Sequence, residues 1–141
     1  MSEAIFTAYG TPVTYLDTDL NSLGIGAAFL GAEIDNSTAR HMLLKAEITL
    51  AQVDLTGPDS PAIVIRLVEC LDGTNYEDHD DKCYAITIPV ADTSAAYKKV
   101  SGDIYIPPGK FKLAVVNETG AAFAGTTNIL KYVIFTPETS A

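Results

Sequence analysis

Tyr84-Ala85-Ile86-Thr87-Ile88-Pro89-Val90 is the stretch that decides the fold class. Its large apolar side chains occupy every second position, and small or polar residues lie between them. Successive side chains of a β-strand point to opposite faces of a sheet, so this period predicts a strand with one buried face. The same period recurs at Phe111, Leu113 and Val115, which alternate with Lys110, Lys112 and Ala114. The chain is therefore expected to be built from strands.

The stretch just before this second strand shows a related pattern. Val100, Ile104 and Ile106 share one face of a predicted strand, and Gly102 on that face indicates a bulge or a close approach. Pro107-Pro108-Gly109 follows directly. Proline fixes φ and glycine accepts a positive φ, so this sequence predicts a type II turn. We expect a hairpin that joins 100–106 to 111–115.

Two further runs are apolar on both faces. Ala62–Leu71 is rich in β-branched residues, and Ile129–Phe135 is similarly two-sided. Such strands are buried on both sides, either at the centre of a sandwich or against another subunit. Clusters of Gly, Pro and Asn separate the runs. The pattern predicts an all-β antiparallel sandwich or jelly-roll-like single domain over 1–141, with 1–10 as an N-terminal arm and 136–141 as a C-terminal tail.

One segment fits two structures. Residues 39–50 place Ala39, Met42, Leu43, Ala46 and Leu50 at helical spacing. As a strand, the same segment turns Leu44, Ala46, Ile48 and Leu50 inward, with a bulge before Val53 and Leu55. The residues alone leave both open and favour the strand. Leu23–Gly31 contains three glycines and small residues, which predict an extended strand or an arm laid against a neighbouring molecule.

The composition limits the classes of function. With 141 residues, 48% of them hydrophobic and 19% charged, the chain is long enough for one core and weakly charged for the surface of a monomer. We expect a partner to cover part of that surface. A net charge of −9 repels phosphate, which argues against nucleic-acid binding. Residues 1–6 lack the basic and apolar regions of a signal peptide, and no apolar run approaches the roughly 20 residues of a membrane span, so we expect synthesis in the cytoplasm.

No catalytic constellation is visible. The loop 72–81 holds five carboxylates and His79, which raises the hypothesis of a divalent-cation site. Its order does not match a calcium-loop motif, and we interpret it as a solvated acidic turn. His41 is the second histidine, and neither histidine begins a zinc-protease motif. Cys70 and Cys83 flank the loop, either as neighbours across a hairpin or as free thiols. We expect a non-enzyme with no catalytic residues, cofactor or metal.

The tyrosines carry a further hypothesis. Tyrosine side chains suit either a sugar-binding groove or a protein interface. The alternative interpretation is that they are ordinary strand residues. The seven are Tyr9, Tyr15, Tyr76, Tyr84, Tyr97, Tyr105 and Tyr132.

Three stretches occur in a familiar order. They are Leu20–Leu23 continuing to Gly31–Asn36, then Leu71–Tyr76, then Ile106–Lys112 through Asn117–Gly120 to Asn128–Tyr132. This ordering resembles a family of small structural proteins of tailed bacteriophages, among them capsid decoration (cement) proteins. The similarity spans roughly residues 20 to 132. It implies an all-β virion protein and favours the strand interpretation of 42–47.

The resemblance implies a virion protein made in the bacterial host cytoplasm. Its expected partners are the major capsid protein and copies of itself, in an oligomer or lattice, with no nucleic acid and no membrane. The candidate contacts are Ile5, Phe6 and Tyr9, the segment Leu23–Leu30, and Ile134 with Phe135, which would bury apolar surface between capsomers. Two alternatives remain: a host-carbohydrate-binding or fibre module, and a head–tail connector or tail component.

Overall fold

The computed structural model describes residues 4–6, 10–51, 60–78, 84–90 and 97–139. In this part of the chain the regular structure is β-strand, apart from one short 3₁₀ helix at Thr18–Leu20. The strands are β1 (Ala4–Phe6), β2 (Val13–Leu16), β3 (Ala28–Leu30), β4 (Ile34–Asp35), β5 (Leu43–Leu50), β6 (Ala62–Glu69), β7 (Tyr84–Pro89), β8 (Tyr97–Val100), β9 (Ile104–Tyr105), β10 (Lys110–Glu118), β11 (Ile129–Phe135) and β12 (Pro137–Thr139). The all-β prediction is confirmed. No helix in these ranges is long and apolar enough to cross a membrane.

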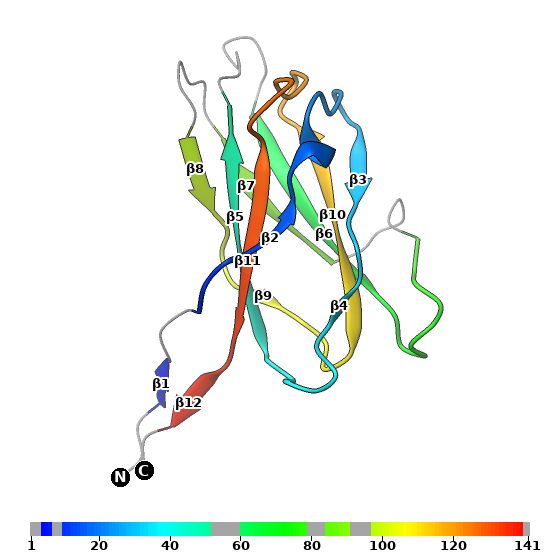
Figure 1. The fold of residues 1–141 in the computed structure, drawn as a ribbon, viewed down its shortest axis with the longest axis vertical. Helices are drawn as coiled ribbons and strands as arrows, with labels where there is room; N and C mark the ends of the chain where they lie inside the picture. Colours follow the sequence, from blue (N-terminus) through cyan, green and yellow to red (C-terminus); the bar gives the residue numbers. More distant parts are fainter. Residues whose placement is uncertain (1–3, 7–9, 52–59, 79–83, 91–96, 140–141) are drawn as a thin grey trace.

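The strands form two five-stranded antiparallel sheets that face each other (Figure 1). One sheet has the order β2-β11-β5-β8, with β9 also paired to β5, and the other has the order β3-β10-β6-β7, with β4 also paired to β10. Between β2 and β11 the chain stays within one sheet only from β3 to β4, from β6 to β7 and from β8 to β9, and of these pairs only β6 and β7 are hydrogen-bonded to each other. This order is that of a jelly-roll sandwich.

The core lies between the two sheets. Its largest fully buried side chains come from the inward faces of the central strands and include Leu44, Ile48, Leu50, Ile63, Ile65, Phe111, Leu113 and Leu130. Burial of an aliphatic or phenyl side chain contributes about 1.5–3 kcal/mol, so this layer supplies most of the folding free energy.

The ambiguous segment 39–50 forms a strand. Leu44, Ala46, Ile48 and Leu50 of β5 are at most 1% exposed and belong to the core. β5 lies between β11 on one side and β8 and β9 on the other, so both its edges are hydrogen-bonded. Tertiary packing of the alternating apolar face outweighs the helix propensity of its residues. The bulge expected before Val53 and Leu55 falls outside the described residues.

The predicted hairpin over 100–115 is wrong. β9 pairs with β5 in one sheet, whereas β10 pairs with β3, β4 and β6 in the other, so 107–109 crosses between sheets. Gly109 does not adopt a positive φ, and the type II turn is therefore also absent. The crossing is held by Asn36, whose buried Nδ2 donates to the carbonyls of His41 and Pro107. Alternation predicted the strand over 111–115 correctly, but turn chemistry does not specify which strands pair.

An interruption at 101–103 separates β8 from β9 along the edge of β5. It changes the phase of the strand, so that Ser101 is buried while Val100 is 51% exposed. The hydroxyl of Ser101 accepts a hydrogen bond from the amide of Ala46. The irregularity expected at Gly102 is therefore present, but Val100 lies on the outer face and does not share the inward face of Ile104.

The segment Leu23–Gly31 is part of the domain, which corrects its interpretation as an arm on a neighbour. Residues 28–30 form β3 and pair with β10, while Leu23 and Phe29 pack against the core. Phe135 at the other proposed contact is buried and Ile134 packs against the core, so neither is a free tail. Strand pairing and core packing therefore bury these apolar side chains within one chain.

The two ends of the chain meet. β1 pairs with β12 over three residue pairs, from Ala4 with Thr139 to Phe6 with Pro137. Figure 1 shows this ribbon extending beyond the sandwich, next to the marks for both termini. The expected arm and tail are therefore paired with each other.

Tyr15 of β2 joins the two sheets along one side of the sandwich. Its hydroxyl donates to the carbonyl of Ala32 and accepts from the amide of Leu113 in β10. Tyr132 packs against the ring edge to face, with centroids 5.7 Å apart. Gly31 makes room for the ring, since a Cβ there would lie 2.3 Å from Cε2 of Tyr15. We call this group the Tyr15 contact.

Candidate functional site

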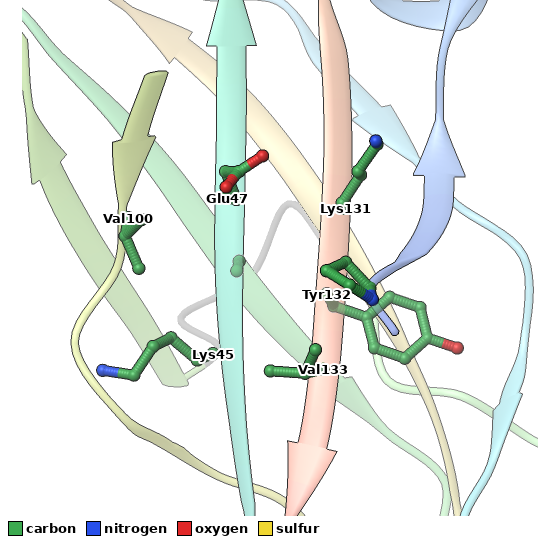
Figure 2. A pocket seen from close by; sticks show the side chains of 8 residues that line it. Lys45, Glu47, Val100, Lys131, Tyr132 and Val133 are labelled. Atoms are coloured by element: carbon green, nitrogen blue, oxygen red, sulfur yellow. The ribbon is translucent and has the colours of Figure 1, made fainter. Parts of the chain in front are cut away.

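A shallow groove lies on the outer face of the β2-β11-β5-β8 sheet (Figure 2). Lys131, Glu47 and Val100 form one cross-strand row over β11, β5 and β8, and Val133 pairs with Lys45 in the next. Pro12, Ala46 and Tyr132 complete the lining. Its volume of about 180 Å³ is below the roughly 300 Å³ at which ligand pockets begin.

Charged side chains border this groove. Nζ of Lys45 lies 3.0 Å from Asp103, and Nζ of Lys98 lies 3.6 Å from Glu47. Both pairs are partly exposed, so each contributes little to stability. The groove is lined by two lysines, one carboxylate and aliphatic side chains. Such a lining can contact a side chain of another protein. His41 is not among its lining residues.

The end of the sandwich opposite the terminal ribbon is closed by a network of buried polar side chains. Asn117, at the end of β10, is fully buried and donates through Nδ2 to the carbonyls of Leu23 and Ala121. Its Oδ1 accepts from the amide and the hydroxyl of Thr119. Its backbone exchanges two further hydrogen bonds with Gly26 and Ala27. One asparagine therefore fixes the segment 23–27 and the start of the segment 118–128.

Asn128 performs the same role at the start of β11. It is 1% exposed, donates through Nδ2 to Asn21 and to the carbonyl of Ala124, and accepts from the amide of Ala51. Ser22 and Thr127 have positive φ beside it. Non-glycine residues hold this conformation only where the surroundings fix it. We call the segments 17–27 and 118–128 the loop end.

The acidic loop after β6 uses its first carboxylate internally. Asp72 accepts through Oδ1 from the amides of Thr74 and Asn75, and through Oδ2 from the side chain of Asn75. The hydrogen bonds from Asn75, followed by that from Thr74, hold the pKa of Asp72 well below its usual range. Glu77 likewise accepts from the amide of Glu69. These carboxylates shape the turn, and 79–81 lie outside the described residues.

A small cluster covers the outer face of the other sheet near this loop. Nζ of Lys112 lies 4.2 Å from the ring centroid of Tyr76, a cation–π contact, and Lys110 lies 3.5 Å from Glu33. Burial and then the Glu33 carboxylate raise the pKa of Tyr76 to about 12. Its buried hydroxyl has no hydrogen-bond partner of ordinary geometry among the described groups.

The remaining candidates lie apart from one another. Nδ1 of His41 is 3.1 Å from the hydroxyl of Thr136, and Cys70 is buried beside Asp72. His79 and Cys83 lie outside the described residues, so the relation of the two cysteines is not tested. Within the described ranges no three side chains of His, Cys, Asp or Glu gather as a metal site would require.

The tyrosines do not share one surface. Tyr15 and Tyr132 lie inside the Tyr15 contact, Tyr84 is 51% exposed on β7, and Tyr105 is 69% exposed on β9 in the other sheet. Tyr9 lies outside the described residues. The described tyrosines therefore form no continuous aromatic groove.

Sequence patterns missed both the loop end and the groove. Asn117-Glu118-Thr119-Gly120 is a cluster typical of a loop, and a single sequence does not distinguish a buried asparagine from an exposed one. The groove is lined by side chains of β5, β8 and β11, which only strand pairing brings together. A more specific signal was the pair of asparagines at the two ends of 117–128.

Comparison with known proteins gives no relative. No protein-family model matches the chain, and no curated protein matches it. What the structure defines is the class of an all-β jelly-roll sandwich with paired termini.

Proposed function

We propose that the chain is a non-enzymatic virion protein of a tailed bacteriophage that decorates the capsid by binding the major capsid protein. The proposal rests on the resemblance of the three stretches in 20–132. Decoration requires a stable domain whose surface binds a repeated partner, and each bound copy then stabilises the shell by linkage.

One observation supports giving weight to that resemblance. The three stretches, separate in sequence, contact one another in the fold. Asn36 bonds to Pro107, Glu33 pairs with Lys110, and Tyr76 lies over Lys112. Asn117 bonds to Leu23, and Asn128 bonds to Asn21. Residues that contact one another in a fold are the ones that proteins sharing that fold are expected to retain.

The test uses capsids of the phage that encodes the chain, assembled without it. Purified full-length protein is added, the capsids are sedimented, and the bound copies are counted and located by electron microscopy. Decoration predicts a copy number that follows the number of capsomers, together with a raised temperature of capsid disruption. A single ring of copies at one vertex would support the connector alternative. Absence of binding, with binding to a glycan array, would support host recognition, and either result overturns the proposal.

A further inference from the structure

The loop end carries a feature that the fold itself does not require. Gly24-Ile25-Gly26-Ala27 forms a turn closed by a hydrogen bond from the amide of Ala27 to the carbonyl of Gly24. Gly26 has φ +72° and supplies the conformation that such a turn needs. Ile25 lies at its corner with 67% of its surface exposed. A polar residue would hold this corner equally well.

The turn is rigid because its flanks are fixed by backbone hydrogen bonds. The amide of Gly26 donates to the carbonyl of Asn117, whose own amide donates to Ala27. The carbonyl of Leu23 accepts from the side chain of Asn117 and from the amide of Phe123. An apolar side chain on a fixed support loses little conformational entropy when it binds.

The neighbours of Ile25 leave it accessible. Gly24 has no positive φ, and a Cβ there would meet only Ala27 at 4.0 Å, an ordinary contact. Neither backbone conformation nor packing therefore requires glycine at position 24. Glycine also occurs where another backbone approaches closely, and that explanation fits the corner beside Ile25.

The charge of this end indicates the chemistry of the partner. The segments 17–27 and 118–128 contain no lysine or arginine, and the carboxylates of Asp17, Asp19 and Glu118 are exposed. Arg40 and Lys110 lie toward the opposite end, and Lys98 and Lys99 lie on β8, where they pair with Thr49 and Ile48 of β5. Complementary charges give specificity and increase the association rate.

We propose that the loop end is the surface that binds the capsid, with Ile25 as its apolar anchor. The partner surface has an apolar pocket bordered by lysine or arginine side chains. This inference rests on the proposed function and adds to it the residue that makes the contact and the chemistry of the site that receives it.

The test compares full-length variants in the capsid-binding assay. Ile25→Ser is expected to weaken binding about tenfold, whereas Ile25→Leu keeps most of the affinity. Leu71→Ser is the matched control, because Leu71 is also an exposed aliphatic residue but follows β6 at the other end of the sandwich. Asp19→Lys is expected to weaken binding severalfold, mainly through a slower association. Equal thermal unfolding midpoints show that the variants fold.

The outcomes separate the two proposals. If the wild-type chain binds and Ile25→Ser binds equally well, the loop end is not the contact and this inference alone fails. Equal weakening by Leu71→Ser and Ile25→Ser overturns it as well, because the loss then does not depend on the loop end. If the wild-type chain does not bind, the proposed function fails and this inference fails with it.

Discussion

The Tyr15 contact and the loop end both use side-chain hydrogen bonds to hold the sandwich, but they differ in how the bonds are distributed. At the Tyr15 contact one hydroxyl joins two strands of opposite sheets. At the loop end Asn117 and Asn128 make several bonds each, mainly to loop backbone. The first ties sheet to sheet, and the second prepares a surface. Substitutions at the Tyr15 contact and at the loop end should therefore have different effects.

Asn117→Ala is expected to have the largest effect. It removes one of two hydrogen bonds at each of the Leu23 and Ala121 carbonyls, and it removes the acceptor of the buried Thr119 amide. An unsatisfied buried group costs about 1–3 kcal/mol and each further lost hydrogen bond about 1 kcal/mol, so we expect a loss of about 3 kcal/mol in the free energy of unfolding. Urea denaturation measures this loss. Asn75→Ala, in an exposed turn, is the control with an expected loss of about 0.5 kcal/mol. Equal losses would show that the network is not cooperative.

Gly31→Ala comes next and tests the Tyr15 contact. A Cβ at position 31 collides with the Tyr15 ring, and the ring can move only by breaking its two hydrogen bonds. We expect a loss of about 2 kcal/mol. The same substitution in a Tyr15→Leu background should cost much less. A double-mutant cycle by urea denaturation measures the coupling, and additive losses would contradict the proposed collision.

Tyr15→Phe keeps the ring and removes only the hydroxyl. The Leu113 amide and the Ala32 carbonyl lose this partner, so we expect a loss of about 1 kcal/mol. The fold and the position of Ile25 should be unchanged, because the loop end is held separately. Tyr105→Phe, at a tyrosine that is 69% exposed, serves as the control and should change nothing measurable. Thermal unfolding and capsid binding together check both statements.

The smallest expected effect is on the pH dependence of stability. Burial raises the pKa of Tyr15 from 10.0 to about 12, so the folded state keeps this proton at a pH where the unfolded chain releases it. The contribution to stability is complete below pH 10 and is lost as the pH rises from 10 toward 12. Tyr15→Phe should flatten this decline only in part, because the pKa values of Tyr76 and Tyr132 are also raised. Unfolding midpoints across that range would contradict the prediction if the variant declined as steeply as wild type.

Strand positions were predictable because alternation records which side chains are buried. It gave the inward face of 111–115 correctly and favoured the correct structure for 43–50, whereas in 84–90 it gave Ile88 and Val90 correctly but also placed Tyr84, which is 51% exposed, on the inward face. It did not give strand pairing. Pro107-Pro108-Gly109 favours a reversal of the chain, but the pairing of Ile104 with Leu44 is decided by contacts distant in sequence. A sandwich prediction was therefore possible, and the order of its strands was not.

The candidate surfaces were less predictable. Leu23–Leu30 was selected for its small and apolar residues, and only Ile25 of that segment is strongly exposed. The segment was predicted to be an extended strand or an arm on a neighbour, and residues 28–30 form a strand that pairs with β10. The need for glycine at position 31 was likewise not predictable from local sequence, because it comes from the ring of Tyr15, sixteen positions earlier in the chain. Exposure is a property of the packed domain, which local patterns do not contain.

The pairing of β1 with β12 has a practical consequence for fusion proteins. Because the two chain ends lie together beyond the sandwich, cargo fused to either terminus leaves the domain at the same place (Figure 1). That place is at the far end of the molecule from Ile25. A chain anchored through the loop end would therefore present such cargo outward, and N-terminal and C-terminal fusions would be equivalent carriers.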